Sequence, residues 1–279
     1  MRTIKIAYRS LIDEAAIVRN VRHALTRDIK TIARCEARDG SLIIVGGGPS
    51  VARRIDKIKR IVNEGGQILA LNEAAHFLIE NGVRPWGVAH LAPSPYTARC
   101  IGTPYPDVTY FLASMVPPDA FDRTDGLDVV MWHTSGPGVS QALDREDVCI
   151  VDGGQTIGLR AFGLGYHLGF RTFHVFGMDS SFEEGELHAY RSVSYADEAA
   201  GFLLNCDGRE FHCTCEMAGQ AQDAIAVLNG LIAAGCKVQV YGEGLLPHRW
   251  RAVQEGRGPA NLEVGGTGPD PLVLEAYMF

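Results

Sequence analysis

A glycine-rich turn follows an apolar run at two places in the chain, and these two segments limit the possible folds most. The first is the run 43–45 followed by Gly46-Gly47-Gly48-Pro49-Ser50, and the second is the run 148–151 followed by Asp152-Gly153-Gly154-Gln155-Thr156. Each is typical of a buried strand, a tight turn and the start of a helix. The first N–H groups of a helix lack intrahelical partners and favour an anion such as phosphate. The two turns therefore predict a cleft that holds a phosphorylated ligand from both sides.

Strand and helix patterns alternate between residues 41 and 241. We expect strands at 42–45, 68–71, 87–91, 108–113, 127–133, 148–151, 172–177 and 237–241, a hairpin at 202–205 and 210–214, and helices at 51–63, 73–80, 155–167 and 216–234. This alternation predicts an α/β fold, a Rossmann-like and mostly parallel doubly wound sheet with helices on both faces. Gly158, Gly163 and Gly165 fall inside a predicted helix, which indicates close packing of that helix on the sheet.

The two ends of the chain follow different patterns. Residues 1–40 are expected to form an N-terminal helical segment, because apolar residues recur at helical spacing between 11 and 35. Residues 41–248 form the predicted nucleotide-binding domain. Residues 249–279 are dense in glycine and proline and are expected to form an extended tail. The apolar residues 272–279 suggest that this tail docks on a neighbouring subunit of a homo-oligomer.

Composition excludes several partner classes. The net charge is −7 and no basic run is interleaved with aromatic residues, which argues against a nucleic-acid partner. No apolar stretch reaches the length of a signal peptide or a transmembrane helix, which argues against a membrane partner. We therefore expect a cytoplasmic protein.

The seven cysteines are odd in number and lack the spacing of a disulfide framework, so we expect reduced thiols. One group, Cys206, His212, Cys213 and Cys215, has residue types that bind zinc, although the usual two-residue spacer between paired cysteines is absent. The alternative is a set of small buried thiols in a hairpin. The sequence leaves both interpretations open.

Ligands of an open parallel sheet bind at the carboxyl ends of its strands, near the point where the strand order reverses. Polar residues at such positions are Ser50, Asn72, His90 and Asp179, besides the second glycine-rich turn. Ser50 and Asn72 either bind a ligand or cap a helix. Asp179 contacts ribose hydroxyls, holds a metal or caps a turn.

Two histidines are candidates for acid/base chemistry. His188 lies in a polar loop, and His212 lies beside the cysteines. Each is either a general acid/base or a surface histidine.

Together these segments resemble the MptE-like family, which is named for an archaeal 6-hydroxymethylpterin diphosphokinase and includes bacterial motility accessory factor proteins. The core is similar to that of bacterial sialyltransferases that use CMP-sialic acid. The resemblance is carried by residues 43–51, 68–83, 152–179 and 182–189, in that order, and covers about residues 41–241.

The resemblance implies a set of site residues. The residues expected to bind the nucleotide and its phosphate are Gly46, Gly47, Gly48, Ser50, Asn72, Asp152, Gly153, Gly154, Gln155 and Thr156. Asp179 and His188 are expected to face the acceptor, with His188 or His212 as the catalytic base. Gly47 departs from the asparagine of the sialyltransferases, which removes one side-chain contact to the nucleotide.

The resemblance implies glycosyl transfer from a nucleotide-activated sugar of CMP type to a small-molecule or glycan acceptor, with no required cofactor. The first alternative is a 6-hydroxymethylpterin-type diphosphokinase that uses Mg²⁺ and ATP. Those enzymes are expected to hold Mg²⁺ with aspartates after the third strand, whereas residues 88–93 of this chain contain no carboxylate. The second alternative is a non-catalytic assembly or binding protein on the same fold, which the missing aspartates and the tail favour.

Overall fold

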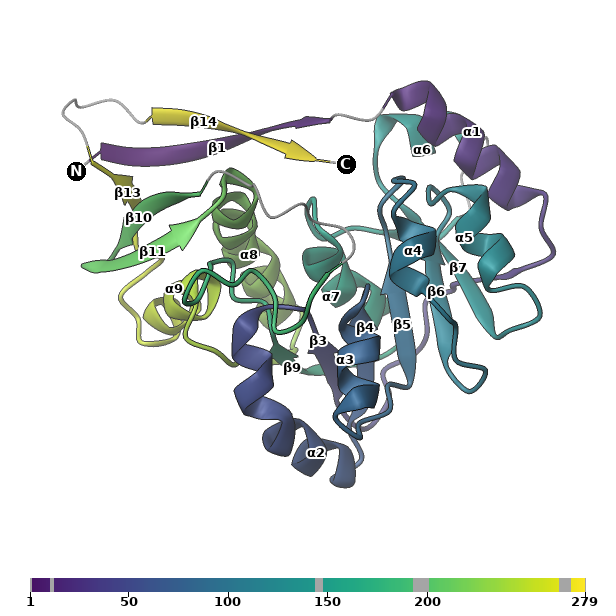
Figure 1. Ribbon diagram of the computed structural model, residues 1–279, viewed down its shortest axis with the longest axis horizontal. Coiled ribbons are helices and arrows are strands. Elements are labelled where there is room, and N and C mark those ends of the chain that lie inside the picture. The colour runs from purple at the N-terminus through teal and green to yellow at the C-terminus, as the bar shows by residue number, and fades with distance from the viewer. Residues whose placement is uncertain (1, 11–12, 144–147, 193–200, 266–271, 279) are drawn as a thin grey trace.

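The computed structural model describes residues 2–10, 13–143, 148–192, 201–265 and 272–278 (Figure 1). Within these residues the chain forms a large parallel sheet flanked by helices and a smaller mixed sheet beside it. The predicted α/β class, with its mostly parallel sheet and helices on both faces, is confirmed. None of the described helices has both the length and the apolar character needed to cross a membrane.

The large sheet has the order β12-β9-β3-β4-β5-β6-β7-β2, and β8 also pairs with β7. Every pairing in it is parallel. Its strands are β2 (Lys30–Thr31), β3 (Leu42–Val45), β4 (Gln67–Leu71), β5 (Gly87–His90), β6 (Thr109–Ala113), β7 (Val129–Thr134), β8 (Ile150–Val151), β9 (Thr172–Phe176) and β12 (Lys237–Val240). The central strands are buried on both faces, which explains why they are continuous apolar runs in the sequence.

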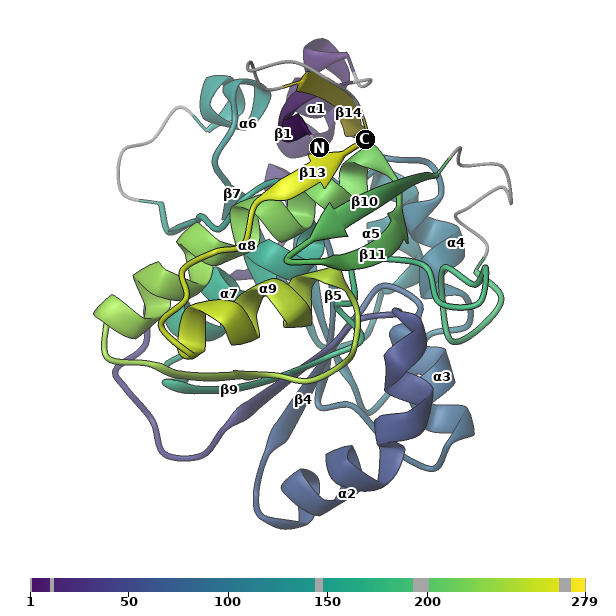
Figure 2. The same cartoon turned by 90° about the vertical axis from the view of Figure 1, so that its left-hand side faces the viewer.

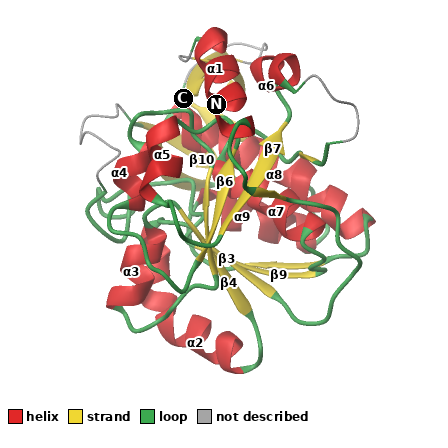
Figure 3. Ribbon diagram, turned by 90° about the vertical axis from the view of Figure 1, so that its right-hand side faces the viewer, coloured by secondary structure: helices red, strands yellow, loops and turns green. Residues whose placement is uncertain are grey.

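Helices cover both faces of this sheet (Figure 3). They are α1 (Glu14–Leu25), the 3₁₀ turn η1 (Pro49–Arg54), α2 (Ile55–Asn63), α3 (Ala74–Glu80), α4 (Thr97–Ile101), α5 (Pro118–Arg123), α6 (Pro137–Ala142), α7 (Ile157–His167), α8 (Cys215–Ala233) and α9 (Leu245–Gln254). Helices α3, α4 and α5 lie on one face, and α7 crosses the other beneath β3, β4 and β5. Helix α8 packs between α7 and the smaller sheet.

Glycines allow α7 to approach the sheet, as its sequence indicates. A β-carbon at Gly165 would lie 2.5 Å from the side chain of Leu42 in β3 and 2.8 Å from that of Phe173 in β9. A β-carbon at Gly163 would overlap with the carbonyl oxygen of Asp152. The predicted close packing of this helix is therefore confirmed.

The smaller sheet joins the two ends of the chain. Its order is β11-β10-β13-β1-β14, with β1 (Arg2–Ser10), β10 (Phe202–Cys206), β11 (Arg209–Cys213), β13 (Leu262–Val264) and β14 (Leu272–Met278). Strands β1 and β14 are parallel neighbours over the whole length of β14 and pack on α8, as Figures 1 and 2 show. The apolar end of the tail thus finds its strand partner within the chain.

The predicted organisation of both ends needs correction. The segment 1–40 is not helical throughout, since it begins with β1 and its helix ends at Leu25. The apolar residues that continue the helical spacing, Ile29 and Ile32, flank β2, which pairs with β7 instead. The tail also contains the strands β13 and β14, and α9 crosses the predicted boundary at 248. For β1, β2, β13 and β14, pairing with a distant segment outweighs the local pattern.

Candidate functional site

The strand order reverses at β3, and this places the first glycine-rich turn at the position where ligands of such sheets bind. Strands β4 to β7 lie on one side of β3, and β9 and β12 lie on the other. The carboxyl ends of β3, β4 and β9 therefore meet, and the segments that follow them surround the turn.

Most backbone donors of this turn are already used. The N–H groups of Gly46 and Gly48 donate to carbonyl oxygens at the end of β9, with N···O distances of 2.9 and 2.8 Å. The N–H of Ser50 donates to Oδ2 of Asp179 at 2.9 Å. The predicted role of these three amides in holding a phosphate therefore needs correction: they fasten β3 to β9. In the described part of the chain, the amide of Gly47 has no such bond.

Asp179 holds the first glycine-rich turn in place through its hydrogen bond with Ser50. Only 4% of the residue is exposed, and burial raises the pKa of its carboxyl, although the bonds to Ser50 oppose that shift. A β-carbon at Gly48 would lie 2.5 Å from its Oδ2, and one at Gly242 would lie 2.7 Å from its Oδ1. Asp179 and Ser50 line a cavity of about 50 Å³.

The loop that contains His188 lies directly on Gly47. The N–H of Ala189 donates to the carbonyl oxygen of Gly47 at 2.9 Å. A β-carbon at Gly47 would lie 2.9 Å from Nδ1 of His188 and would overlap with the hydroxyl of Tyr190. The two rings are stacked, with centroids 5.5 Å apart and an interplanar angle of 8°. The structure therefore brings His188 to the first glycine-rich turn.

Helix α3 completes this arrangement from the neighbouring strand. Glu73, which directly precedes α3, is 7% exposed, and its carboxylate accepts a hydrogen bond from Oγ of Ser192. The ring of Phe77, in the same helix, packs 5.7 Å from that of Tyr190. We refer to Gly47, Glu73, His188, Tyr190 and Ser192 as the strand-end cluster.

Burial and charge set the protonation states in this cluster. Burial lowers the pKa of His188, while the charge of Glu73 and a backbone hydrogen bond to Gly47 act in the opposite direction. Burial and the charge of Glu73 raise the pKa of the Tyr190 phenol. At neutral pH the imidazole is therefore neutral and able to accept a proton, and the phenol keeps its proton.

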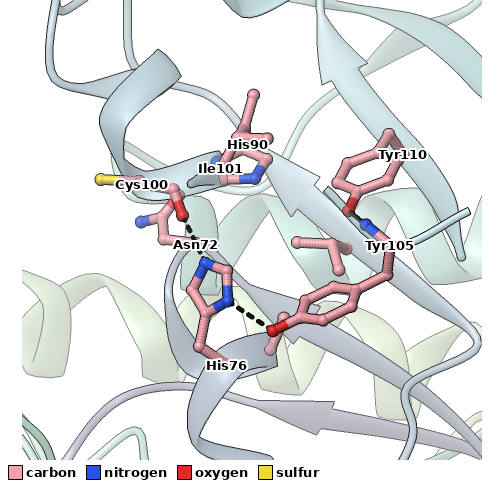
Figure 4. Close-up of a pocket in the computed structure, with 9 residues that line it drawn as sticks. Asn72, His76, His90, Cys100, Ile101, Tyr105 and Tyr110 are labelled. Atoms are coloured by element: carbon pink, nitrogen blue, oxygen red, sulfur yellow. Dashed lines mark hydrogen bonds between the residues drawn. The ribbon is translucent and has the colours of Figure 1, made fainter. Parts of the chain in front are cut away.

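Asn72 lies beside the cluster but its side chain lines a different pocket (Figure 4). Its backbone has a φ of +51°, and its N–H donates to the end of β5. Side chains fill this pocket. His76 bonds the hydroxyl of Tyr105 at 2.8 Å and the carbonyl oxygen of Cys100 at 3.2 Å. His90 is fully buried, which lowers its pKa to about 3, and neither ring nitrogen has a hydrogen-bond partner among the described residues.

The second glycine-rich turn folds against its own helix. Gly153 and Gly154 have φ values of +144° and +99°, and a β-carbon at Gly153 would lie 2.6 Å from the carbonyl oxygen of Leu159. The hydroxyl of Thr156 accepts the N–H of Leu159 and caps α7, whereas the neighbouring Gln155 is exposed. The positive φ values alone explain why both positions are glycine, so no bound ligand is needed to account for these residues.

The two turns do not open onto a single empty cleft. A β-carbon at Gly46 would lie 3.4 Å from the side chain of Met178, and one at Gly158, in the first turn of α7, would lie 2.8 Å from the same side chain. Met178 therefore fills the space between the end of β3 and the start of α7. The expectation of a phosphate held by both turns needs correction, because a large apolar side chain takes that position.

Arg160 is a buried cation that the sequence analysis missed. It lies in the first turn of α7, and its guanidinium donates to Oγ of Ser135 at 2.9 Å and to the carbonyl oxygen of Val151 at 2.7 Å. The exposed Asp152 is 3.6 Å away. Asp152 is thus placed beside a guanidinium at the turn.

His212 lies in the smaller sheet. It is exposed on β11, its carbonyl oxygen accepts the N–H of Phe182 at 2.8 Å, and the two rings are 4.7 Å apart. These contacts are separate from those of Gly47 and His188.

The cysteines near His212 do not converge on one point. In the β10–β11 hairpin Cys213 pairs with Phe202 and Cys206 pairs with Arg209, at opposite ends of the ladder. Cys215 begins α8 and so is not on the strand with Cys213. Burial raises the pKa of Cys206 to about 11 and that of Cys213 to about 12, so both are thiols at neutral pH. Within the described residues, no three His, Cys, Asp or Glu side chains are placed to hold a metal.

Three members of the strand-end cluster were also missed. Glu73 is the second polar residue after the apolar run 68–71. The first, Asn72, was interpreted as the polar residue at this strand end, and Glu73 was not singled out. Tyr190 and Ser192 follow His188 in a loop without periodicity. Their contacts with Gly47 and Glu73 join segments more than 100 residues apart, which no local pattern encodes.

Comparisons with known proteins bear on the family and the fold of the chain. A family model described as 6-hydroxymethylpterin diphosphokinase MptE-like matches residues 15–185 of the 279. The chain is similar in structure to a MAf glycosyltransferase from Magnetospirillum magneticum AMB-1, with a TM-score of 0.62 at 16% sequence identity. The similarity covers 90% of this chain and 42% of that protein, so this chain spans less than half the length of its structural relative. No curated protein matched the chain.

Proposed function

Because the chain belongs to the MptE-like family, we propose that it is a transferase that moves a sugar from a nucleotide-activated donor of CMP type to an acceptor hydroxyl. The fold it shares with a glycosyltransferase supports this proposal. The observation that carries it is the neutral imidazole of His188, held on the glycine-rich turn at the point where the strand order reverses.

The chemistry follows from this arrangement. The acceptor oxygen attacks the anomeric carbon of the donor, the bond between that carbon and the phosphate oxygen breaks, and the nucleotide departs with the bonding electrons. His188 takes the acceptor proton. The amide of Gly47 and the phenol of Tyr190 are donors that stabilise the negative charge on the departing phosphate.

Ligand binding is the first test of this function. Thermal unfolding is measured with CMP, CDP, UDP, GDP and ATP, each with and without Mg²⁺. A ligand at a hundred times its Kd adds about 2.7 kcal/mol to the free energy of unfolding. Stabilisation by CMP without metal supports the glycosyl route. Absence of stabilisation by every nucleotide contradicts it and favours a non-catalytic protein.

Turnover is the second test, measured as release of CMP from a CMP-sugar. His188→Ala is expected to lower the rate by at least about a hundredfold while leaving the stabilisation by CMP intact, because a general base contributes that much. The rate of the wild-type enzyme is expected to fall only at a pH below the ordinary imidazole pKa of about 6.5, because burial lowers the pKa of His188. His212→Ala is the matched control. Loss of turnover in that control, with turnover retained in His188→Ala, would make His212 the base.

The name of the family model favours a second candidate, diphosphate transfer from ATP to a pterin. Such transfer needs oxygen ligands for Mg²⁺. The end of β5 instead presents His90, a buried neutral imidazole. Release of AMP from ATP that requires Mg²⁺ would establish this activity in place of glycosyl transfer.

A further inference from the structure

We propose that Glu73 binds the ribose of a nucleotide by accepting hydrogen bonds from its 2′- and 3′-hydroxyls. This inference rests on the proposed function, since the proposed donor of CMP type carries a ribose and the inference names the side chain that binds it. It assigns a ligand contact to a side chain that the resemblance leaves without a role.

The position of Glu73 is the first argument. Strand β4 pairs with β3 in parallel, with Ala70 opposite Val45, so the residues after the two strands lie side by side. In doubly wound nucleotide-binding sheets, an acidic side chain at the end of the second strand accepts the ribose 2′-hydroxyl, while the glycine-rich turn after the first strand lies at the phosphate. Glu73 and Gly47 have these relative positions here.

The environment of the carboxylate is the second argument. Glu73 is 7% exposed, which is rare for a glutamate that serves no interaction. Its carboxylate already accepts a hydroxyl, Oγ of Ser192, from the loop that covers Gly47. A ribose hydroxyl makes the same kind of bond, and a carboxylate has about four lone-pair positions to receive two of them. A hydroxyl is therefore a group that this carboxylate accepts in the folded chain.

The distribution of charge is the third argument. A carboxylate repels phosphate, so Glu73 is unsuited to the phosphate end of a nucleotide. The donors of the cluster, the amide of Gly47 and the phenol of Tyr190, lie together at the turn. A nucleotide with its phosphate at Gly47 would place the negative charge beside hydrogen-bond donors. Its ribose hydroxyls would then lie at the Glu73 carboxylate, which accepts hydrogen bonds.

The test compares ribonucleotides with deoxyribonucleotides in two proteins. The probes are the four ribonucleoside 5′-monophosphates and their 2′-deoxy counterparts, and the Kd of each is measured by calorimetry with the full chain. Wild type is expected to bind at least one ribonucleotide about ten- to a hundredfold more tightly than its deoxy form, because a hydrogen bond to a charged group has that effect. Glu73→Gln is expected to reduce this ratio by about tenfold. Glu80→Gln, an exposed glutamate at the end of the same helix, should leave the ratio unchanged.

The ratio isolates the hydroxyl contact, because any change in repulsion of the phosphate affects both members of a nucleotide pair equally. Equal binding of the two forms by wild type, or a preference that persists in Glu73→Gln, overturns the role of Glu73 and leaves nucleotide-dependent transfer standing. Binding of no nucleotide overturns both. If Glu73→Gln does not fold, a crystal structure of wild type with the preferred ribonucleotide decides: ribose oxygens more than 3.5 Å from the Glu73 carboxylate overturn the inference.

Discussion

Asp179 is a buried acid, and two opposing effects act on the pKa of its carboxyl. Burial favours the neutral carboxyl, while the backbone N–H of Ser50 favours the charged form, and the net result is a raised pKa. The folded protein therefore retains a proton on Asp179 up to a higher pH than the unfolded chain does. Where the folded state binds more protons, the free energy of unfolding decreases as pH rises.

This balance predicts the behaviour of Asp179→Asn. The asparagine amide keeps an acceptor for the Ser50 N–H but carries no charge. The free energy of unfolding of this variant, relative to wild type, should therefore increase as the pH rises from about 4 through the raised pKa of Asp179, and then level off. Urea unfolding of both proteins between pH 4 and 8 measures this difference. A difference that is constant or shrinks with increasing pH contradicts the raised pKa. Asp179→Ala, which leaves the Ser50 N–H buried without its acceptor, should lose about 1–3 kcal/mol.

At the scale of one element, helix α7 shows how packing decides whether a glycine stabilises or destabilises a helix. Glycine inside a helix costs about 1 kcal/mol relative to alanine. Gly163 is nevertheless required, because a β-carbon there would overlap with the backbone carbonyl of Asp152 in the second glycine-rich turn. Gly230 in α8 has nothing within 4 Å of the corresponding position.

The two glycines therefore predict opposite outcomes of the same substitution. Gly163→Ala should lower the free energy of unfolding by at least about 2 kcal/mol, since either the helix or the turn must shift. Gly230→Ala should raise it by about 0.5–1 kcal/mol, through helix propensity alone. Urea unfolding measures both. Stabilisation by Gly163→Ala would show that α7 does not pack against the turn as described.

At the scale of the whole molecule, the parallel pairing of β1 with β14 joins the N-terminal and C-terminal segments in one sheet. Ala276 of β14 is fully buried in the smaller sheet, whereas Val273 of the same strand is 59% exposed. Strands β1 and β14 contact α8, which in turn packs on α7. The tail thus belongs to the folded unit, although its amino-acid composition predicts an extended segment.

Two matched substitutions test this placement of the tail. Ala276→Asp should lower the free energy of unfolding by at least about 2 kcal/mol, because it buries a carboxylate without a partner. Val273→Asp should change it by less than about 0.5 kcal/mol, because its side chain stays in water. Equal tolerance of both, measured by urea unfolding at several protein concentrations, would indicate that β14 docks elsewhere, as on a second subunit.

The sequence by itself determined the large parallel sheet, the first glycine-rich turn and the position of His188 in a polar loop. Buried parallel strands are apolar runs, and tight strand-to-helix turns need glycine, so both leave a local signal. The alternation of Ile4 and Ile6 with polar residues in β1 was also a local signal, but the longer helical pattern that follows it obscured it.

Only the tertiary structure decided which groups meet. It showed that Asp179 and β9 use the amides of Gly46, Gly48 and Ser50, and that Met178 fills the space beside the second turn. It also brought Glu73 to the loop that carries His188. Apart from the contact of Met178 with Gly158, these contacts join segments more than 100 residues apart. Side-chain volume and hydrogen-bond geometry select them only once the sheet has formed.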